Sequence, residues 1–360
     1  MRYASGQVLT PDGFIDGHVG FEDGIVGEVG KGSAKSSVAQ GIIVSTLINA
    51  HTHIADYLVP LDLHEPLEKL VAPPDGLKHR ILEKTSDKNL KRAMVQMSAF
   101  MRSRGVTQFF DFREGGYEGS RLLSSLRGGC PRPLILGRPK KLQFDWEEVD
   151  LILSTCEGIG VSSISDWDYG ILSELSAYVR SKGKVFALHA SERVREDIDW
   201  VLDLKPSFLV HMTTATKADI EACANADVAI VVCVRSNLFF GREPPLAEMV
   251  RSGATVALGT DNAMICLPDI LLEMEFAGRL LRKQGMTDLR PVFDMATKSG
   301  RKLLNEKRPI AIDGIEPGQP CDFMVIRSHG GDSFTDLVLR SSSTDPLLVC
   351  MGREAWRGTP

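Results

Sequence analysis

The chain has 360 residues, of which 43% are hydrophobic and 25% are charged. These values are typical of a folded globular protein and exclude a disordered, collagen-like or low-complexity chain. The formal net charge of −5 and the pI near 6.0 provide no basic surface, so we expect no nucleic-acid partner. Amphipathic and lipidation signals are lacking, and the longest apolar run, Val228–Val234, is too short to span a bilayer. Dispersed cysteines without a CxxC pair indicate buried thiols, so we expect a cytoplasmic protein without membrane contact.

The first 45 residues are rich in glycine and valine and predict short strands and turns. From residue 46 to 307, short apolar runs alternate with stretches of helical spacing. The predicted strands are Ile42–Ala50, Val106–Phe112, Pro133–Gly137, Ile159–Ser165, Lys184–His189, Phe208–His211, Val228–Val234 and Thr255–Gly259. The predicted helices include Asp87–Arg104, Trp146–Cys156, Tyr169–Ser181, Lys217–Asn225, Pro244–Ser252 and Asp269–Gln284. This alternation over ~250 residues predicts an α/β fold, a (β/α)8 TIM barrel.

The C-terminal part of the chain alternates at Gly314–Arg327 and predicts a last strand at Leu347–Gly352. We therefore expect residues 1–45 and 308–360 to form one small, discontinuous β-sandwich domain. The barrel would then occupy residues 46–307. A doubly wound sheet is the alternative, but no GxGxxG follows the first barrel strand to support a dinucleotide site.

Histidines stand at the ends of predicted barrel strands, where the catalytic groups of such barrels lie. His51 and His53 end the first strand, and alternation along a strand points both side chains to one side. His189 ends the fifth strand, His211 ends the sixth, and Asp261 follows the eighth. Three imidazoles with one carboxylate form a ligand set suited to Zn²⁺ or Fe²⁺. Histidines hydrogen-bonded at strand ends are the alternative interpretation.

This pattern of HxH on strand one, His on strands five and six and Asp on strand eight resembles the metal signature of the amidohydrolase superfamily. Within it, the His189-x-x-Glu192 motif and the Ser236-Asn237 pair resemble those of the cytosine, guanine and S-adenosylhomocysteine deaminases and of the triazine hydrolases. The segment Glu316–Phe323 resembles the return of the chain into the family's β domain. The resemblance thus covers most of the chain.

The sequence departs from the family pattern at two places. Ser45-Thr46 stands where the family has Pro-Gly before the HxH strand, and Val234-Arg235 lacks the usual proline before Arg-Ser-Asn. The fourth predicted strand, Ile159–Ser165, contains neither the lysine nor the glutamate that bridges two metals in binuclear members. The resemblance therefore implies one divalent ion, with zinc expected first and iron as the alternative. The implied ligands are His51, His53, His189 and Asp261.

The resemblance also implies roles in catalysis. Asp261 would accept the proton of the attacking water, Glu192 would act as general acid and base, and His211 would stabilise charge on the attacking oxygen. Alternatively, Glu192 is an acidic residue at a helix start. We expect hydrolytic deamination of an aminated heterocycle, a nucleobase, nucleoside or related small molecule. The alternatives are cyclic amide hydrolysis, as in imidazolonepropionase-like relatives, and a catalytically silent metal-binding barrel.

Further polar residues follow the strand ends. Arg113, Arg138 and Arg235 can bind a carboxylate or phosphate of the substrate together with Asn237, or the arginines can pair with nearby acidic residues. The proline-containing segment 57–84 is either a lid over the pocket or an inert surface excursion. A homodimer is the expected assembly for a barrel of this type.

Overall fold

A computed structural model of the protein describes residues 1–61, 67–71, 76–303 and 314–357. The chain divides into two compact units. Unit 1 comprises residues 1–48, 100–107 and 269–360, and unit 2 comprises residues 49–99 and 108–268. The predicted boundary between residues 307 and 308 lies outside the described residues, and the predicted domain bounds stay a prediction.

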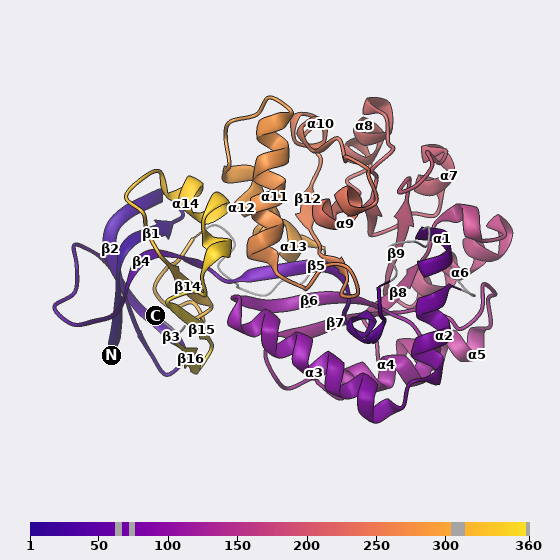
Figure 1. Ribbon diagram of the computed structural model, residues 1–360, viewed down its shortest axis with the longest axis horizontal. Coiled ribbons are helices and arrows are strands. Elements are labelled where there is room, and N and C mark those ends of the chain that lie inside the picture. The colour runs from indigo at the N-terminus through magenta and orange to yellow at the C-terminus, as the bar shows by residue number, and fades with distance from the viewer. Residues whose placement is uncertain (62–66, 72–75, 304–313, 358–360) are drawn as a thin grey trace. The chain divides into compact units, whose positions relative to one another are not determined.

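The sheet of unit 1 contains strands from both ends of the chain (Figure 1). Its strands are β1 (Arg2–Thr10), β2 (Gly13–Glu22), β3 (Ile25–Lys31), β4 (Ser37–Ser45), β14 (Phe323–Ile326), β15 (Leu348–Met351) and β16 (Glu354–Trp356). In the order β16-β15-β14-β4-β1-β2-β3, the N-terminal β4 pairs with the C-terminal β14. Phe21 on β2 and Phe323 on β14 have ring centroids 5.1 Å apart although β1 and β4 lie between their strands. The sequence predicted a sandwich, and the strands form one sheet that curls over its own core.

The helices of unit 1 precede and follow β14. They are α11 (Ile270–Lys283), α12 (Arg290–Ala296), α13 (Lys298–Lys302), α14 (Ser333–Leu339) and the 3₁₀ turn η3 (Ser341–Ser343). Asp269 and Asp332 begin α11 and α14 by accepting hydrogen bonds from backbone N–H groups of the first turn. These N-terminal caps stabilise the first turns of the two helices.

The second sheet has nine strands in the order β12-β11-β10-β9-β8-β7-β6-β5-β13. They are β5 (Leu47–His53), β6 (Val106–Arg113), β7 (Arg132–Gly137), β8 (Gly158–Val161), β9 (Val185–Ala190), β10 (Phe208–His211), β11 (Ala229–Val232), β12 (Val256–Leu258) and β13 (Asp261–Asn262). The pairings on both sides of β10 and between β5 and β13 are parallel. Between β12 and β13, Gly259 donates its N–H to Val232 and Thr260 donates to His51. The sheet is therefore curled and parallel, as predicted, while the strict (β/α)8 repeat stays a prediction.

Helices alternate along the chain with the strands of this curled sheet (Figure 1). They are η1 (Ile54–Leu58), α1 (Leu67–Val71), α2 (Leu77–Lys84), α4 (Gly116–Ser124), α5 (Trp146–Leu153), η2 (Ile164–Asp166), α6 (Tyr169–Ser181), α7 (Ile198–Asp203), α8 (Lys217–Asn225), α9 (Val234–Phe239) and α10 (Leu246–Arg251), with α3 (Asp87–Ser103) running into unit 1. Inside the sheet, the rings of Phe110 and Phe208 lie 5.5 Å apart. Phe112 lies 4.5 Å from the ring of His51. Aromatic rings therefore pack inside the sheet, and one of them, Phe112, packs against His51.

The bounds predicted for the first barrel strand are wrong. The predicted strand Ile42–Ala50 is divided between β4, which ends at Ser45, and β5, which begins at Leu47. Ile43, Val44, Leu47 and Ile48 are all buried, so the apolar run shows no break where the chain changes sheets. β5 itself extends to His53, so His51 and His53 lie at the end of the strand, as predicted. No helix in the described part of the chain is long and apolar enough to cross a membrane.

Candidate metal site

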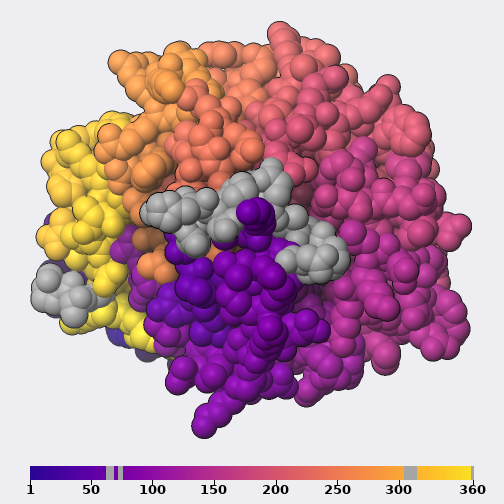
Figure 2. Space-filling view, turned by 45° about the vertical axis from the view of Figure 1, so that its right-hand side comes forward, coloured from indigo at the N-terminus to yellow at the C-terminus, as the bar shows by residue number. Residues whose placement is uncertain are grey.

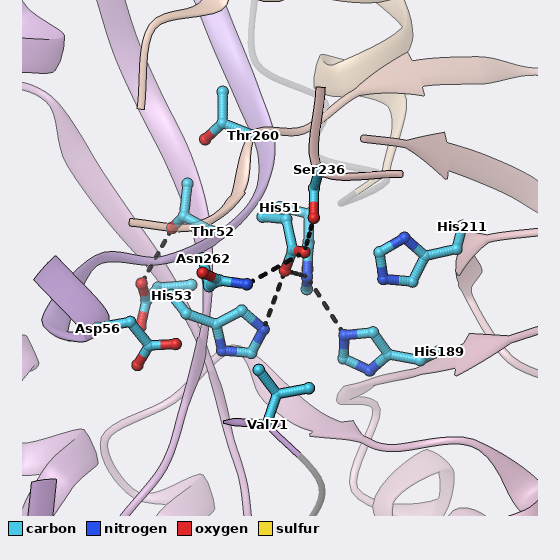
Figure 3. A network of polar contacts seen from close by, with 12 residues as sticks. His51, Thr52, His53, Asp56, Val71, His189, His211, Ser236, Thr260 and Asn262 are labelled. Atoms are coloured by element: carbon cyan, nitrogen blue, oxygen red, sulfur yellow. Dashed lines mark hydrogen bonds and ion pairs between the residues drawn. The ribbon is translucent and has the colours of Figure 1, made fainter. Parts of the chain in front are cut away.

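The predicted metal ligands meet at the carboxyl ends of the parallel strands (Figure 3). His51 and His53 come from β5, His189 from β9, His211 from β10 and Asp261 from β13. One ligand atom from each of His51, His53 and His189 lies within 4.8 Å of the other two, and His51, His211 and Asp261 meet the same criterion. The structure thus brings together all five residues that the sequence singled out at strand ends.

The distances between these ligand atoms suit one metal ion. Nε2 of His51 lies 3.3 Å from Nε2 of His189. Oδ1 of Asp261 lies 3.5 Å from Nε2 of His51 and 3.7 Å from Nε2 of His53. Two nitrogen ligands bound ~2.0–2.1 Å from a tetrahedral zinc ion are about 3.3 Å apart. The donor atoms are therefore close enough together to share a metal ion.

A hydrogen bond at the far side of the His189 ring fixes which of its nitrogens carries the proton. Nδ1 of His189 donates to the carbonyl of Val161 at 2.8 Å, so its Nε2 carries a lone pair. Nε2 of His51 lies 3.3 Å from this atom, and Nδ1 of His53 lies at an ion-pair distance of 2.9 Å from Oε1 of Glu114. Lone pairs that face one another repel unless a cation shares them. These residues therefore fit a metal ion by their chemistry as well as by their spacing.

The charge states of these side chains also suit a cation. Burial lowers the pKa of His51 to about 3 and holds the pKa of His189 well below its ordinary value. For Asp261, burial favours the acid, but a hydrogen bond to His51 and the neighbouring imidazoles outweigh it and the pKa is lowered. Neutral imidazoles beside an ionised carboxylate are the state that binds a metal ion.

Burial also lowers the pKa of His79 on α2, and this shift leads to a prediction for how the free energy of unfolding depends on pH. Burial lowers the pKa of His79 to about 3, whereas the imidazole of an unfolded chain titrates near ~6.5. Between these values the unfolded chain binds more protons, so the free energy of unfolding decreases as the pH falls from ~6.5 toward ~3. We expect His79→Gln to reduce this decrease by at most about 1 kcal/mol per pH unit. Urea unfolding of metal-free wild type and variant at several pH values measures it, and equal pH dependence in both would contradict the prediction.

Strained backbone occurs at the site residues themselves. His211 has a φ of 79°, Asp261 a φ of 61° and Ser191, which precedes Glu192, a φ of 47°. Non-glycine residues in this region cost about 1–3 kcal/mol each and gather where the surrounding structure holds a functional group in place. Two residues of the ligand clusters, His211 and Asp261, are thus among the strained residues, and a third strained residue precedes Glu192.

Contacts that the sequence analysis did not single out hold β5 against the strand of Asp261. The amide of Asn49 donates to Oγ1 of Thr260 at 2.7 Å and accepts from the Thr260 N–H at 3.1 Å. A Cβ on Gly259 would lie 2.6 Å from Cβ of His51. Only a glycine permits this approach, so it sets the separation between the ligands of the two strands.

Asp111 at the end of β6 supports the HxH motif from another side. Its Oδ2 accepts from Oγ1 of Thr52 at 2.9 Å and from the N–H of Ile54 at 2.8 Å. Burial raises the pKa of Asp111 to about 6. The carboxylate thereby fixes the backbone on both sides of His53. Its place at a strand end is the sequence signal that could have identified it.

The Ser236-Asn237 pair of α9 contacts two of the predicted site residues. Oγ of Ser236 donates to Oδ2 of Asp261 at 2.5 Å. Nδ2 of Asn237 lies 3.1 Å from Nδ1 of His211, so Asn237 orients a histidine, and its predicted contact with substrate stays a prediction. Asn262 adds a second donor to Oδ2 of Asp261 at 3.4 Å. Oδ1 of Asp261 is thus left toward the imidazoles of His51 and His53.

A cavity opens beside the ligand cluster, and Glu192 lines it. Oε1 of Glu192 lies 3.7 Å from Nε2 of His211, and its side chain is 22% exposed. The buried carboxylate of Glu196 accepts from the N–H groups of Ser165 and Ser191 at 3.0 and 2.9 Å. Glu196 thereby fixes the loop that carries Glu192. The structure thus leaves the carboxylate of Glu192 near the cluster and able to reach a bound molecule.

The three predicted arginines lie in different surroundings. Arg138 lines the cavity, with NH1 4.0 Å from Oε1 of Glu114. Arg113 is buried with NH1 3.7 Å from Oε2 of Glu114, and it is not among the residues that line the cavity. Arg235 donates to the carbonyl of Leu267 at 2.8 Å and also lies outside the lining. The geometry therefore supports a substrate contact for Arg138 and gives none to the other two.

The predicted lid segment 57–84 lies partly outside the described residues, which omit 62–66 and 72–75. Of its described parts, α1 contributes Val71 and α2 contributes Lys78 to the cavity lining. In Figure 2, α1 is the dark violet segment at the surface that faces the viewer. The segment thus borders the cavity, and its motion stays a prediction.

Comparison with known proteins places the chain among hydrolases. No protein-family model matches it. It is 31% identical to a protein of Methanothermobacter thermautotrophicus named "Putative aminohydrolase", covering 92% of each chain. It is 33% identical to an Archaeoglobus fulgidus protein of the same name, covering 79% of this chain and 81% of that one. It is 24% identical to the 5-methylthioadenosine/S-adenosylhomocysteine deaminase 1 of Archaeoglobus fulgidus, covering 86% and 81%.

Solved structures share the fold. An adenosine deaminase from Xanthomonas campestris with bound zinc matches with a TM-score of 0.80 at 16% identity, covering 98% of this chain and 92% of that one. A zinc complex of atrazine chlorohydrolase from Arthrobacter aurescens matches with a TM-score of 0.76 at 15% identity, covering 99% and 95%. At these identities, the matches establish the architecture of the chain.

Proposed function

This chain belongs to the amidohydrolase superfamily and is a metal-dependent hydrolase, and we propose that it deaminates an aminated heterocycle by hydrolysis. The substrate class that we propose is a nucleobase, a nucleoside or a related small molecule. The observation that carries the proposal is the position of Glu192, which lines the cavity 3.7 Å from Nε2 of His211 and lies outside the clusters of metal-ligand atoms. A deaminase needs such a carboxylate, because protons must reach both the ring and the leaving amine.

We assign the metal site to His51, His53, His189 and Asp261. The proposal is for a single ion, zinc first, because the donor set is mixed nitrogen and oxygen and its spacing suits one tetrahedral centre. When bound, such an ion lowers the pKa of a water ligand toward ~7 and so supplies hydroxide at neutral pH.

The protein residues then have separate tasks. Asp261 accepts a proton as the water oxygen attacks the ring carbon that bears the amino group. Glu192 carries protons to the ring nitrogen and to the amine, so the C–N bond breaks, ammonia leaves and a carbonyl remains. Asn237 donates to Nδ1 of His211, which leaves Nε2–H of that ring to stabilise charge on the attacking oxygen. Arg138 completes the proposal as a contact for a polar or anionic group of the substrate.

A screen for ammonia release tests the proposed reaction. Purified protein of measured zinc content is incubated with aminated purines, pyrimidines, pterins and triazines, and ammonia is quantified by an enzyme-coupled assay. We expect release from at least one of these rings, and none from an Asp261→Asn preparation, which controls for contaminating deaminases. Ring opening of a cyclic amide without ammonia from any aminated ring would contradict deamination and indicate a cyclic amide hydrolase instead.

A further inference from the structure

A second group of metal-ligand side chains lies directly behind the candidate metal site. Ligand atoms of His53, Asp56 and Glu114 lie within 4.8 Å of one another, and all three residues are buried. Such a group attracts a cation, and here the chain itself provides one. Nζ of Lys78 donates to Oδ2 of Asp56 at 3.0 Å and to Oε1 of Glu114 at 2.7 Å. The ammonium group is therefore enclosed by two carboxylates.

One oxygen atom connects this lysine to the metal ligands. Oε1 of Glu114 accepts from Lys78 and also lies 2.9 Å from Nδ1 of His53. A carboxylate in contact with the far nitrogen of a metal-binding histidine fixes the ring and makes Nε2 a better ligand. The guanidinium groups of Arg113 and Arg138 are farther from Glu114, at 3.7 and 4.0 Å. Lys78 is thus the cation in closest described contact with this carboxylate.

The burial of Lys78 shows how strongly its surroundings hold it. The residue is 3% exposed, and lysines are almost never this buried unless they are paired. Burial alone would lower its pKa, but Asp56 and Glu114 outweigh it and the pKa is raised. Lys78 therefore stays charged. Since it belongs to α2, its contacts connect that helix to the end of β5 that carries His53.

We propose that Lys78 is a positioning residue, whose ammonium holds Glu114 against Nδ1 of His53 and thereby fixes His53 for metal binding. The inference rests on the metal site of the proposed function and adds a residue that its motifs do not include. Substrate binding is the other role open to Lys78, because it lines the cavity. Zinc affinity distinguishes the two roles. If Lys78 contacts only the substrate, replacing it leaves the zinc affinity unchanged.

The test measures zinc affinity by competition with a chelator in the full-length protein. We expect Lys78→Met and Glu114→Gln each to weaken zinc binding by about 10–100-fold. The double variant should bind zinc no more weakly than Glu114→Gln alone, because Lys78 acts through Glu114. Lys84→Met, on the exposed side of the same helix, is the matched control and should bind zinc like the wild type. The absorption spectrum of the cobalt-substituted protein should change in Lys78→Met and stay unchanged in Lys84→Met.

Additional variants keep the test decisive if Lys78→Met does not fold. Asp56→Asn retains the contact between Lys78 and Glu114 and should bind zinc within about threefold of the wild type. The double variant Lys78→Met/Asp56→Asn removes the cation together with one of its two carboxylates, and it should bind zinc more weakly than the wild type. Wild-type zinc affinity in the Lys78 variants, or losses that add in the Lys78/Glu114 double variant, would overturn the inference. A raised KM with unchanged zinc affinity would also overturn it, by assigning Lys78 to the substrate. If the wild type itself binds no zinc, the proposed function fails as well, so the two failures are distinguishable.

Discussion

Replacing Glu192 by glutamine is expected to remove most turnover and to leave zinc affinity unchanged. Glutamine keeps the size and shape of the side chain but cannot carry a proton between the ring and the leaving amine. General acid–base catalysis contributes about 10²–10⁴-fold, so kcat for ammonia release should fall by at least ~10²-fold. The geometry favours unchanged metal binding, because Glu192 lies outside the clusters of ligand atoms and is 22% exposed. Steady-state kinetics and metal analysis of the same preparation measure both quantities.

A matched change elsewhere provides the control. Glu221→Gln on α8 alters an acidic side chain that is 49% exposed, and we expect wild-type kinetics from it. Turnover near the wild-type level in Glu192→Gln would remove this residue from the proposed mechanism. Loss of zinc together with turnover would show instead that Glu192 supports the ligands. Glu196, which fixes the same loop, is unsuitable as a control because both of its oxygens accept backbone N–H groups.

The proximity of the candidate ligands could be predicted from the sequence because of the regularity of the fold. Parallel strands end at one edge of their sheet, so polar residues directly after several apolar runs meet in space. The strand Phe208–His211 was predicted with the bounds that the structure gives, and His211 ends it. The resemblance to the amidohydrolase superfamily then assigned roles to residues that the strand pattern had already placed together.

The supporting contacts could not be predicted, because they depend on approaches that leave no pattern in the sequence. Lys78 belongs to a short helix whose sequence carries no chemical motif, and its contacts with Asp56 and Glu114 bring together three elements. The division of the apolar run at Thr46 between two sheets is equally hidden, since residues on both sides of it are buried. Periodicity reports which face of an element is buried and does not report which neighbour covers it.

Removing the metal is expected to abolish turnover and to destabilise the fold. In the metal-free protein, Nε2 of His53 lies 3.7 Å from the buried carboxylate of Asp261 and Nε2 of His189 lies 3.3 Å from Nε2 of His51, with no cation between these polar atoms. A ligand present at ~1,000 times its Kd stabilises the folded state by about 4 kcal/mol, so the midpoint of thermal unfolding should rise by several degrees when zinc is returned. Dialysis against a chelator, with metal content verified by elemental analysis, followed by calorimetry and the ammonia assay, tests both effects.

Titration of zinc into the metal-free protein connects activity and stability to one site. Because the same side chains hold the ion and surround the reacting water, both quantities should recover together and reach a plateau at one equivalent per chain. A plateau at two equivalents would contradict a single ion and would direct attention to His53, Asp56 and Glu114, the second group of ligand atoms. Undiminished turnover in protein shown to contain no metal would contradict metal-dependent hydrolysis altogether. Asp261→Asn gives an independent check, since removing the charge of this ligand should lower zinc affinity and turnover in the same sample.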